Sequence, residues 1–294
     1  MRGTNKKLLL HFILLAGTMF FFGCASRNKR LTHLSDQDLE NWVCVYSEHA
    51  SPDEIRKFDL AVLDSDAHPD LSQLRNSRTI LLGYISLAEV GQYRWFWPEI
   101  SNQDWILDKN PNWDSWMVDV REQSWHDFVL DRIIPRILTD GFRGLFLDTI
   151  DTAEYLEKWH TGKKTPGAQD SMIKLIREIR RRYPKIYLVG NRGFSILNEI
   201  GPYLDGVVAE SIFTDVDLTN DKMQLSSADQ YDRRVRELKR ARDKFHLMVF
   251  TLDYMNRSLA PEIQNIIAIS RANGFVPFVS TPRLDTVYQD TLEP

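Results

Sequence analysis

The chain is poor in the residues that build disulfides and metal sites. Its 294 residues include only two cysteines, Cys24 and Cys44, and the seven histidines lie singly along the sequence. Without Cys and His at metal-ligand spacing, a zinc site is not expected. Cys44 lies in an apolar run, residues 42–46, and is expected to be a buried strand thiol. We therefore expect no metal and no cofactor.

The chain also lacks an excess of basic residues. Its 37 Lys and Arg are outnumbered by 41 Asp and Glu, which gives a formal net charge of −4. A basic surface of the kind that binds nucleic acid is therefore not expected. A Gly-rich phosphate loop after the first apolar run is missing as well, which argues against a dinucleotide-binding open sheet.

The N-terminus has the pattern of a secretory signal peptide. A basic head, residues 1–7, precedes an apolar run, residues 8–23, and Cys24 follows directly. The run is too short and wrongly flanked for a transmembrane helix. A cysteine directly after Gly23 is where bacterial lipoproteins are cut and acylated, so Cys24 is the expected lipidation site.

We therefore expect residues 1–23 to be removed, Cys24 to carry lipid, and the polar residues 25–40 to be a tether. Ala25 and Ser26 give no inner-membrane retention signal. The protein is then exported and held at the cell envelope by its lipid anchor alone, at the outer membrane in a host with two membranes. Plain secretion and an uncleaved anchor are the alternatives.

The remaining chain alternates short apolar runs with helical patterns. The runs are residues 42–46, 59–63, 79–84, 116–120, 144–147, 186–189, 206–209, 247–252 and 275–279. Near-continuous hydrophobicity is typical of parallel strands that are covered on both faces. Between them, residues 125–138 and 172–179 have the periodicity of helices, and Pro261 and Gly274 bound a third.

This alternation predicts βαβ units and an α/β fold, a single (β/α)8 TIM barrel over residues 41–294. Nine candidate strands are one more than the barrel holds, so we expect the first or the last to be supernumerary, or the last to cap the barrel. A doubly wound open sheet is the alternative. Pro135 is expected to kink its helix.

Polar side chains follow most of these runs at the point where each strand should end. They are Asp64, Tyr84 with Ser86 and Glu89, Asp119 with Arg121, Asp148 with Asp151, Asn191, Glu210, and Asp253 with Tyr254. One such residue is usually a cap or a turn former. Seven together predict a shared mouth, because the carboxyl ends of barrel strands converge.

A mouth rich in carboxylates suits glycoside hydrolysis, in which one carboxyl gives a proton and another stabilises or attacks the sugar. A tryptophan-rich segment is a candidate wall for sugar subsites, with about half of its rings expected in ordinary packing. Its members are Trp95, Trp97, Trp105, Trp113 and Trp116.

Several motifs resemble a known family. They are LGYISLAE at 82–89, GFRGLFLDTID at 141–151, NRGF at 191–194, AESIF at 209–213 and GFVPFVS at 274–280. In this order they resemble the endo-α-1,4-polygalactosaminidases, glycoside hydrolase family 114. They are also similar to the family 166 hydrolase domains of Pel exopolysaccharide proteins. Ala88 and Arg143 stand where these families have glycine and aspartate.

The resemblance implies a TIM barrel that cuts an α-1,4-linked galactosamine and N-acetylgalactosamine polymer internally, with retention. It implies the catalytic pair Asp148, at the fifth barrel strand, and Glu210, at the seventh, with Asp148 favoured as nucleophile. The residues expected to line the sugar subsites and orient this pair are Asp64, Tyr84, Glu89, Asp119, Arg121, Asp151, Asn191, Asp253 and Tyr254.

The expected partner is therefore a galactosamine-rich polysaccharide, which is cationic where it is deacetylated and would be attracted by an acidic groove. Two other readings remain open. One is a glycosidase of other α-galactoside specificity on the same barrel. The other is a non-catalytic lipoprotein that binds polysaccharide.

Overall fold

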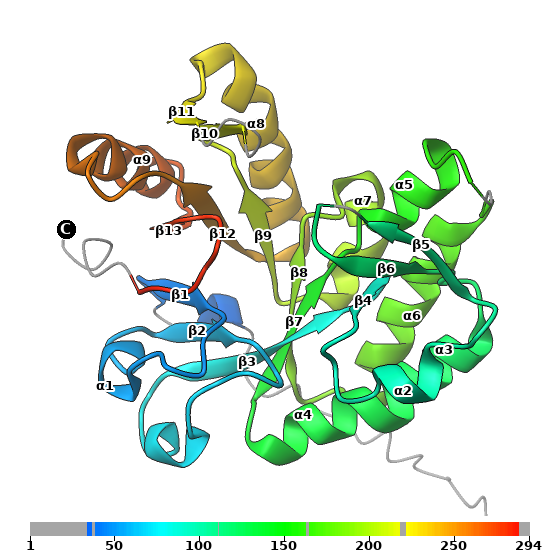
Figure 1. Ribbon diagram of the computed structural model, residues 1–294. Helices are drawn as coiled ribbons and strands as arrows, with labels where there is room; N and C mark the ends of the chain where they lie inside the picture. The colour runs from blue at the N-terminus through cyan, green and yellow to red at the C-terminus, as the bar shows by residue number, and fades with distance from the viewer. Residues whose placement is uncertain (1–33, 37–38, 111, 163–164, 218–221, 288–294) are drawn as a thin grey trace, which may run out of the picture.

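A computed structural model describes residues 34–36, 39–110, 112–162, 165–217 and 222–287 (Figure 1). The expected signal peptide, Cys24 and most of the expected tether lie outside the described residues. Within residues 25–40, Leu34 is fully buried and packs with the core, so contact with the folded body begins at least this early.

The centre of the molecule is an eight-stranded parallel sheet rolled into a barrel, with the strand order β1-β2-β3-β7-β8-β9-β12-β13. The strands are β1 (Trp42–Val45), β2 (Leu60–Leu63), β3 (Ile80–Ser86), β7 (Gly144–Asp148), β8 (Tyr187–Asn191), β9 (Gly206–Glu210), β12 (Met248–Tyr254) and β13 (Val276–Ser280). The first and last strands meet at a seam, where Trp42 Nε1 donates to the Val276 carbonyl over 3.1 Å. The predicted (β/α)8 barrel is confirmed.

Helices cover the outside of the barrel (Figure 1), which explains the unbroken hydrophobicity of the strands. They are α1 (Pro52–Ile55), α2 (Trp97–Ile100), α3 (Gln123–Phe128), α4 (Ile134–Asp140), α5 (Thr152–Lys158), α6 (Ala168–Arg182), α7 (Leu197–Ile200), α8 (Ala228–Phe245) and α9 (Ala260–Ala272). Short 3-10 helices, among them η2 (Leu71–Leu74) and η4 (Phe194–Ile196), complete the connections. Inside the barrel, bulky side chains such as Trp42, Phe146 and Phe250 are almost fully buried.

The extra strand is neither the first nor the last, so that expectation was wrong. The run at 116–120 forms β6 (Ser115–Val118), which pairs antiparallel with β4 (Glu89–Gly91) and β5 (Ile106–Asn110) in a separate sheet. This insertion sheet belongs to the connection from β3 to β7. A short apolar run does not reveal which sheet it joins, and so the strand count was misassigned.

The correction changes the place of the expected catalytic pair along the barrel. Asp148 ends the fourth barrel strand and Glu210 the sixth, rather than the fifth and seventh. A second small sheet, the hairpin of β10 (Thr214–Asp217) and β11 (Lys222–Leu225), follows Glu210.

The helix signals in the sequence match the structure closely. The interruption expected at Pro135 takes the form of a five-residue π-helical turn, η3 (Val129–Ile133), directly before α4, because proline has no N–H to donate. Gly141, with φ of 116°, ends α4 in the left-handed conformation. Pro261 lies in the first turn of α9, as predicted.

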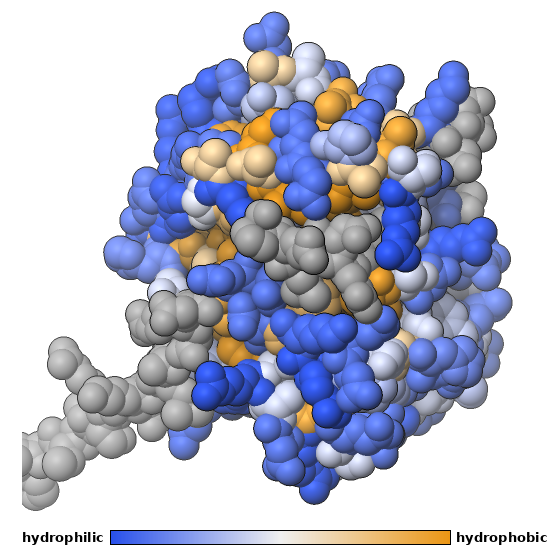
Figure 2. Space-filling view, turned by 90° about the vertical axis from the view of Figure 1, so that its left-hand side faces the viewer, coloured by the Kyte–Doolittle hydropathy of each residue, from blue (hydrophilic) through white to orange (hydrophobic). Residues whose placement is uncertain are grey.

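The face on the side of α1 and α9 is mainly hydrophilic, with hydrophobic residues gathered in its upper half at the height of α9 (Figure 2). Among the helices that the structure describes, none is long and apolar enough to cross a membrane.

Candidate active site

Three neighbouring barrel strands, β7, β8 and β9, end in Asp148, Asn191 and Glu210. The side-chain nitrogen of Asn191 lies 2.8 Å from Asp148 Oδ1 and 2.6 Å from Glu210 Oε1. A single amide group therefore donates to both carboxylates and holds them side by side. The sheet order explains this, since the strand that carries Asn191 lies between the other two.

Two tyrosines complete the contacts of this pair. Tyr84 on β3 donates to Asp148 Oδ2 over 2.7 Å, and Tyr254 on β12 donates to Glu210 Oε2 over 3.2 Å. Burial, together with the neighbouring carboxylate charge, raises the pKa of both phenols. Both tyrosines therefore remain donors at neutral pH. Five residues predicted from the sequence thus form one hydrogen-bonded network.

The environment of Glu210 favours its protonated form. Burial and then the negative charge of Asp148 raise the pKa of Glu210 to about 7, against the opposing effects of Asn191, Arg192 and Tyr254. A carboxyl that titrates near neutral pH is suited to give and take protons.

Each of the three strand-end residues is followed by a residue in the left-handed conformation. Thr149, Arg192 and Ser211 have φ of 58°, 57° and 52°. Such a backbone costs roughly 1–3 kcal/mol for a non-glycine residue and is concentrated at functional sites. Here hydrogen bonds fix it, with Arg192 N donating to the Val208 carbonyl and Ser211 N to the Leu252 carbonyl, both over 2.9 Å.

The hydroxyl of Thr149 ties Asp148 to the start of the insertion. It accepts from the backbone N–H groups of Leu87 at 3.1 Å and Ala88 at 2.9 Å, and lies 2.9 Å from Ser86 Oγ. It also lies 2.8 Å from the carbonyl oxygen of Asp148. The backbone at Asp148 is thus fixed by the chain that leads to Glu89.

Asp151 lies next to the pair and has a single cation as its ion-pair partner among the described residues. Its Oδ2 is 3.2 Å from Arg192 Nε, and about a third of its side chain (36%) is exposed. Burial raises the pKa of Asp151, Arg192 opposes this rise and the charge of Asp148 adds to it. Asp151 is therefore a partly exposed acidic group beside Asp148.

Asp64 is also at a strand end, but its partners are internal. Arg94 donates to both of its oxygens, over 2.9 and 2.8 Å, and both side chains are almost fully buried. Burial alone would raise the pKa of Asp64, yet the hydrogen bonds and charge of Arg94 outweigh it and the pKa is lowered. The guanidinium of Arg94 lies 5.3 Å from the Tyr84 ring centroid, so Asp64 supports Tyr84 indirectly.

Glu89 is likewise buried and joins two elements. It accepts from Ser115 Oγ over 2.5 Å and Asn110 Nδ2 over 3.1 Å in the insertion sheet, and from Thr152 Oγ1 over 2.7 Å in α5. Thr152 directly follows Asp151. Glu89 therefore clamps the insertion sheet onto the segment that carries Asp148 and Asp151.

Asp119 and Arg121 lie at the end of β6, in the insertion sheet rather than at a barrel strand as predicted. The fully buried Asp119 accepts from Arg121 Nε and Nη2, both over 2.8 Å. Arg121 Nη1 also donates to the Pro166 carbonyl oxygen over 3.4 Å, so the pair links the insertion to the segment before α6.

Asp253 on β12 is fully buried and holds the segment after Glu210. It accepts from the backbone N–H groups of Phe213 at 2.8 Å and Thr214 at 3.0 Å. Burial raises the pKa of Asp253 to about 6, although these hydrogen bonds oppose the rise.

Four residues at the site were not singled out from the sequence: Tyr46, Arg94, Thr149 and Arg192. The ring centroid of Tyr46 lies 5.1 Å from that of Tyr84, in an edge-on arrangement. Thr149 and Arg192 lie within the quoted family motifs, and Tyr46 ends the first apolar run. Their positions in the sequence therefore could have indicated that they belong to the site. No sequence pattern indicates Arg94, because its contact is with Asp64, which lies 30 residues earlier in the chain.

Other expectations concern thiols, metals and tryptophans. Cys44 is a fully buried free thiol on β1, as predicted, and the described residues contain no group of acids, histidines and cysteines placed to hold a metal ion. Among the tryptophans, Trp105 packs against Trp125 in the core and Trp97 stacks on Trp116, whereas Trp113 is exposed (61%).

Comparison with known proteins identifies the family. The model of glycoside-hydrolase family GH114 matches residues 25–293. The chain belongs to this family. The predicted resemblance is confirmed, and this GH114 protein is a glycoside hydrolase.

Solved structures agree with this assignment. The glycoside hydrolase domain of PelA from Pseudomonas aeruginosa is similar to this chain, with a TM-score of 0.74 and 25% identity, over 85% of this chain and 97% of that domain. Ega3 of Aspergillus fumigatus, solved in complex with galactosamine, shares the fold with a TM-score of 0.62 and 13% identity, over 87% and 97% of the two chains. An uncharacterized Thermotoga maritima protein is 21% identical over 96% of this chain and 92% of its own length.

Proposed function

We propose that this glycoside hydrolase cleaves an α-1,4-linked galactosamine and N-acetylgalactosamine polysaccharide internally, by a retaining mechanism. Asp148 is the nucleophile and Glu210 the acid/base. The observation that carries the mechanism is the Asn191 amide group, which donates to both carboxylates.

This bridge limits the distance between the two carboxylates. Asp148 Oδ1 and Glu210 Oε1 lie 2.8 and 2.6 Å from the same nitrogen, so they are no further apart than the sum of these two distances. Retaining glycosidases hold their carboxyl groups about 5–5.5 Å apart, whereas inverting enzymes need roughly 6.5–9.5 Å to admit a water. The short separation supports retention.

The raised pKa of Glu210 supports its role as the acid/base and leaves Asp148 as the nucleophile. Glu210 protonates the glycosidic oxygen while Asp148 attacks the anomeric carbon, so the C–O bond to the leaving sugar breaks as a covalent ester to Asp148 forms. In the second step Glu210 takes a proton from water, which attacks the same carbon and releases Asp148. Tyr84 and Asn191 orient the nucleophile, and Tyr254 orients Glu210.

The substrate is supported by two observations. The solved Ega3 complex contains galactosamine, and Ega3 shares the fold. In addition, Asp148, Asp151 and Glu210 place three acidic groups at one end of the barrel, next to which an amino sugar would be attracted. Asp64, Glu89, Asp119 and Asp253 are buried and serve as positioning residues, rather than as sugar contacts.

The experiment is hydrolysis of purified galactosamine-rich polysaccharide by protein that lacks residues 1–24. New reducing ends are followed, and NMR identifies the anomer first released. We expect endo cleavage with the α anomer first, and a loss of about 10²–10⁴-fold in Asp148→Asn and Glu210→Gln. Asp53→Asn and Glu48→Gln change exposed carboxylates (side chains 83% and 67% exposed) and serve as matched controls.

Two results would contradict the proposal. Binding without release, unchanged in both variants, would leave a polysaccharide-binding protein. Release of sugar only from another α-galactoside would contradict the proposed substrate but not the proposed two-carboxylate mechanism.

We also propose that the protein is exported and lipid-anchored through Cys24. The support is the sequence pattern of residues 1–24. Cells given an alkyne-labelled fatty acid should yield labelled protein in the membrane fraction. Label that persists in Cys24→Ala would contradict acylation at this site.

A further inference from the structure

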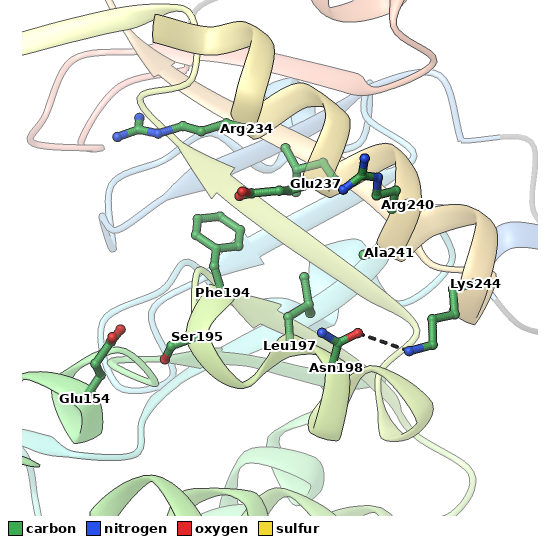
Figure 3. Close-up of a pocket in the computed structure, with 11 residues that line it drawn as sticks. Glu154, Phe194, Ser195, Leu197, Asn198, Arg234, Glu237, Arg240, Ala241 and Lys244 are labelled. Carbon is green, nitrogen blue, oxygen red and sulfur yellow. Dashed lines mark hydrogen bonds between the residues drawn. The ribbon is translucent and has the colours of Figure 1, made fainter.

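A cavity of about 560 Å³ lies outside the barrel, between the β8–α7 connection and α8 (Figure 3). Its volume is within the range of roughly 300–1,000 Å³ of pockets that bind small ligands. None of the residues proposed for catalysis lines it, so it needs a separate explanation.

The cavity adjoins the catalytic pair on one side. Arg234 of α8, which lines it, donates to the carbonyl oxygen of Ser211 over 2.9 Å, and Ser211 directly follows Glu210. On its opposite wall, Phe194 follows the Arg192–Gly193 turn, whose arginine pairs with Asp151. A polymer chain leaving the catalytic pair on this side would therefore meet the cavity.

Part of the cavity wall is apolar. Phe194 is 38% exposed and its ring points into the space between η4 and α8 (Figure 3). Leu197 and Leu238 lie beside it and are buried. Aromatic faces of this kind accept the C–H face of a sugar ring, and the leucines offer a surface for a methyl group.

The charges around the cavity differ from those of the catalytic mouth. Arg234, Arg240 and Lys244 face two acids, Glu154 and Glu237, so that cations predominate. Lys244 Nζ donates one hydrogen bond, over 3.1 Å, to Asn198 Oδ1. A sugar that bears an ammonium group would be repelled here, whereas an uncharged N-acetyl sugar would not.

We propose that this cavity is a remote subsite for N-acetylated sugar residues of the same polysaccharide chain that is cut at Asp148 and Glu210. This inference rests on the proposed function. The acetyl methyl contacts the apolar wall, and polar side chains such as Glu237 and Asn198 meet the hydroxyl groups. The enzyme thus reads the acetylation pattern at a distance from the bond that it breaks.

The first test uses chain length. Phe194→Ala should raise KM for a long N-acetylated polymer roughly 3–10-fold with little change in kcat, since it removes binding away from the reacting sugar. The ratio of kcat/KM for this polymer to that for a short aryl glycoside should fall accordingly. Leu259→Ala, which removes another exposed apolar side chain (36%), is the control and should leave the ratio unchanged.

The second test uses charge. Arg240→Glu should increase cleavage of de-N-acetylated polymer relative to N-acetylated polymer by about two- to fivefold. Arg236→Glu makes the same change on the same helix, but at an exposed residue that does not line the cavity. An equal shift in both variants, or an unchanged ratio of long to short substrate in Phe194→Ala, would overturn the proposal.

Binding separates this inference from the proposed function. Calorimetry on the Glu210→Gln protein measures its affinity for an N-acetylated oligosaccharide while the ligand stays uncleaved. Weaker binding in the Glu210→Gln, Phe194→Ala double variant would support the subsite. Equal binding in the two proteins would overturn it, whereas a wild-type protein that releases no sugar would overturn the proposed function.

Discussion

The hydroxyl of Tyr84 donates to Asp148 Oδ2 over 2.7 Å, although the two residues are 64 positions apart in the sequence. Removing this donor in Tyr84→Phe leaves the ring in place but deprives the carboxylate of one of its two side-chain hydrogen bonds. A hydrogen bond to a charged group contributes about 1.5–3 kcal/mol, so we expect kcat to fall roughly 10- to 100-fold.

The matched control is Tyr46→Phe. Tyr46 packs edge-on against Tyr84, but its hydroxyl is directed to Cys44 rather than to Asp148. We expect its kcat to stay within about threefold of the parent, because an uncharged hydrogen bond contributes little net free energy. Equal losses in the two variants would mean that the loss in Tyr84→Phe does not come from its hydrogen bond to Asp148.

The pH dependence of kcat/KM should report Glu210. Burial and the charge of Asp148 raise the pKa of Glu210 to about 7, and the first step requires its protonated form. Activity should therefore be present below this pH and fall as the pH rises through about 7. Because the Tyr254 hydroxyl lowers this pKa, Tyr254→Phe should move the alkaline limb to higher pH. A limb that stays in place would assign it to another group.

The buried pair of Arg94 and Asp64 should dominate local stability. Their side chains are only 7% and 10% exposed, so Arg94→Met leaves a buried carboxylate without its charge partner. Breaking such a pair costs about 3–5 kcal/mol of the free energy of unfolding. Urea denaturation measures this loss.

Arg181→Met is the comparison for that measurement. Arg181 pairs with Glu178 on the surface of α6, with side chains 72% and 33% exposed, and pairs of this kind contribute about 0–1 kcal/mol. Similar losses for Arg94 and Arg181 would show that burial of the Arg94–Asp64 pair has no special effect.

Thr149 should act as a positioning residue for Asp148. Thr149→Val keeps the shape but leaves the N–H group of Ala88 without its acceptor, at a cost of about 1–3 kcal/mol, whereas the Leu87 N–H keeps the Asp148 carbonyl oxygen at 3.0 Å. We expect kcat to fall roughly tenfold or more in Thr149→Val, whereas Thr149→Ser restores the hydroxyl and most of the activity. A Ser variant as impaired as the Val variant would exclude the hydroxyl as the cause.

Much of the fold and of the hydrogen-bonded network around Asp148 and Glu210 could be predicted because both depend on local patterns. Each barrel strand is covered on two faces and therefore reads as an unbroken apolar run. Its first polar residue marks the end that faces the mouth, and Asp148, Asn191 and Glu210 are residues of this kind. Sheet order then brings these three together without further information.

The rest depends on contacts between distant segments. A strand end predicts where Asp64 and Asp253 lie along the barrel, but not that Arg94 or the Phe213 and Thr214 amides occupy their oxygens. The run at 116–120 was assigned to the barrel because periodicity carries no information on its sheet partners.

The Glu89 clamp has a consequence for protein engineering. One carboxylate links the insertion sheet to the segment after Asp148, because it binds Ser115 and Asn110 on one side and Thr152 on the other. Asp148 and Glu210, the residues proposed to carry out the cleavage, end strands of the barrel instead. A designer who keeps Glu89 and Thr152 together with Asn110 and Ser115 can therefore vary the rest of the β5–β6 hairpin as a module without removing the partners of this carboxylate.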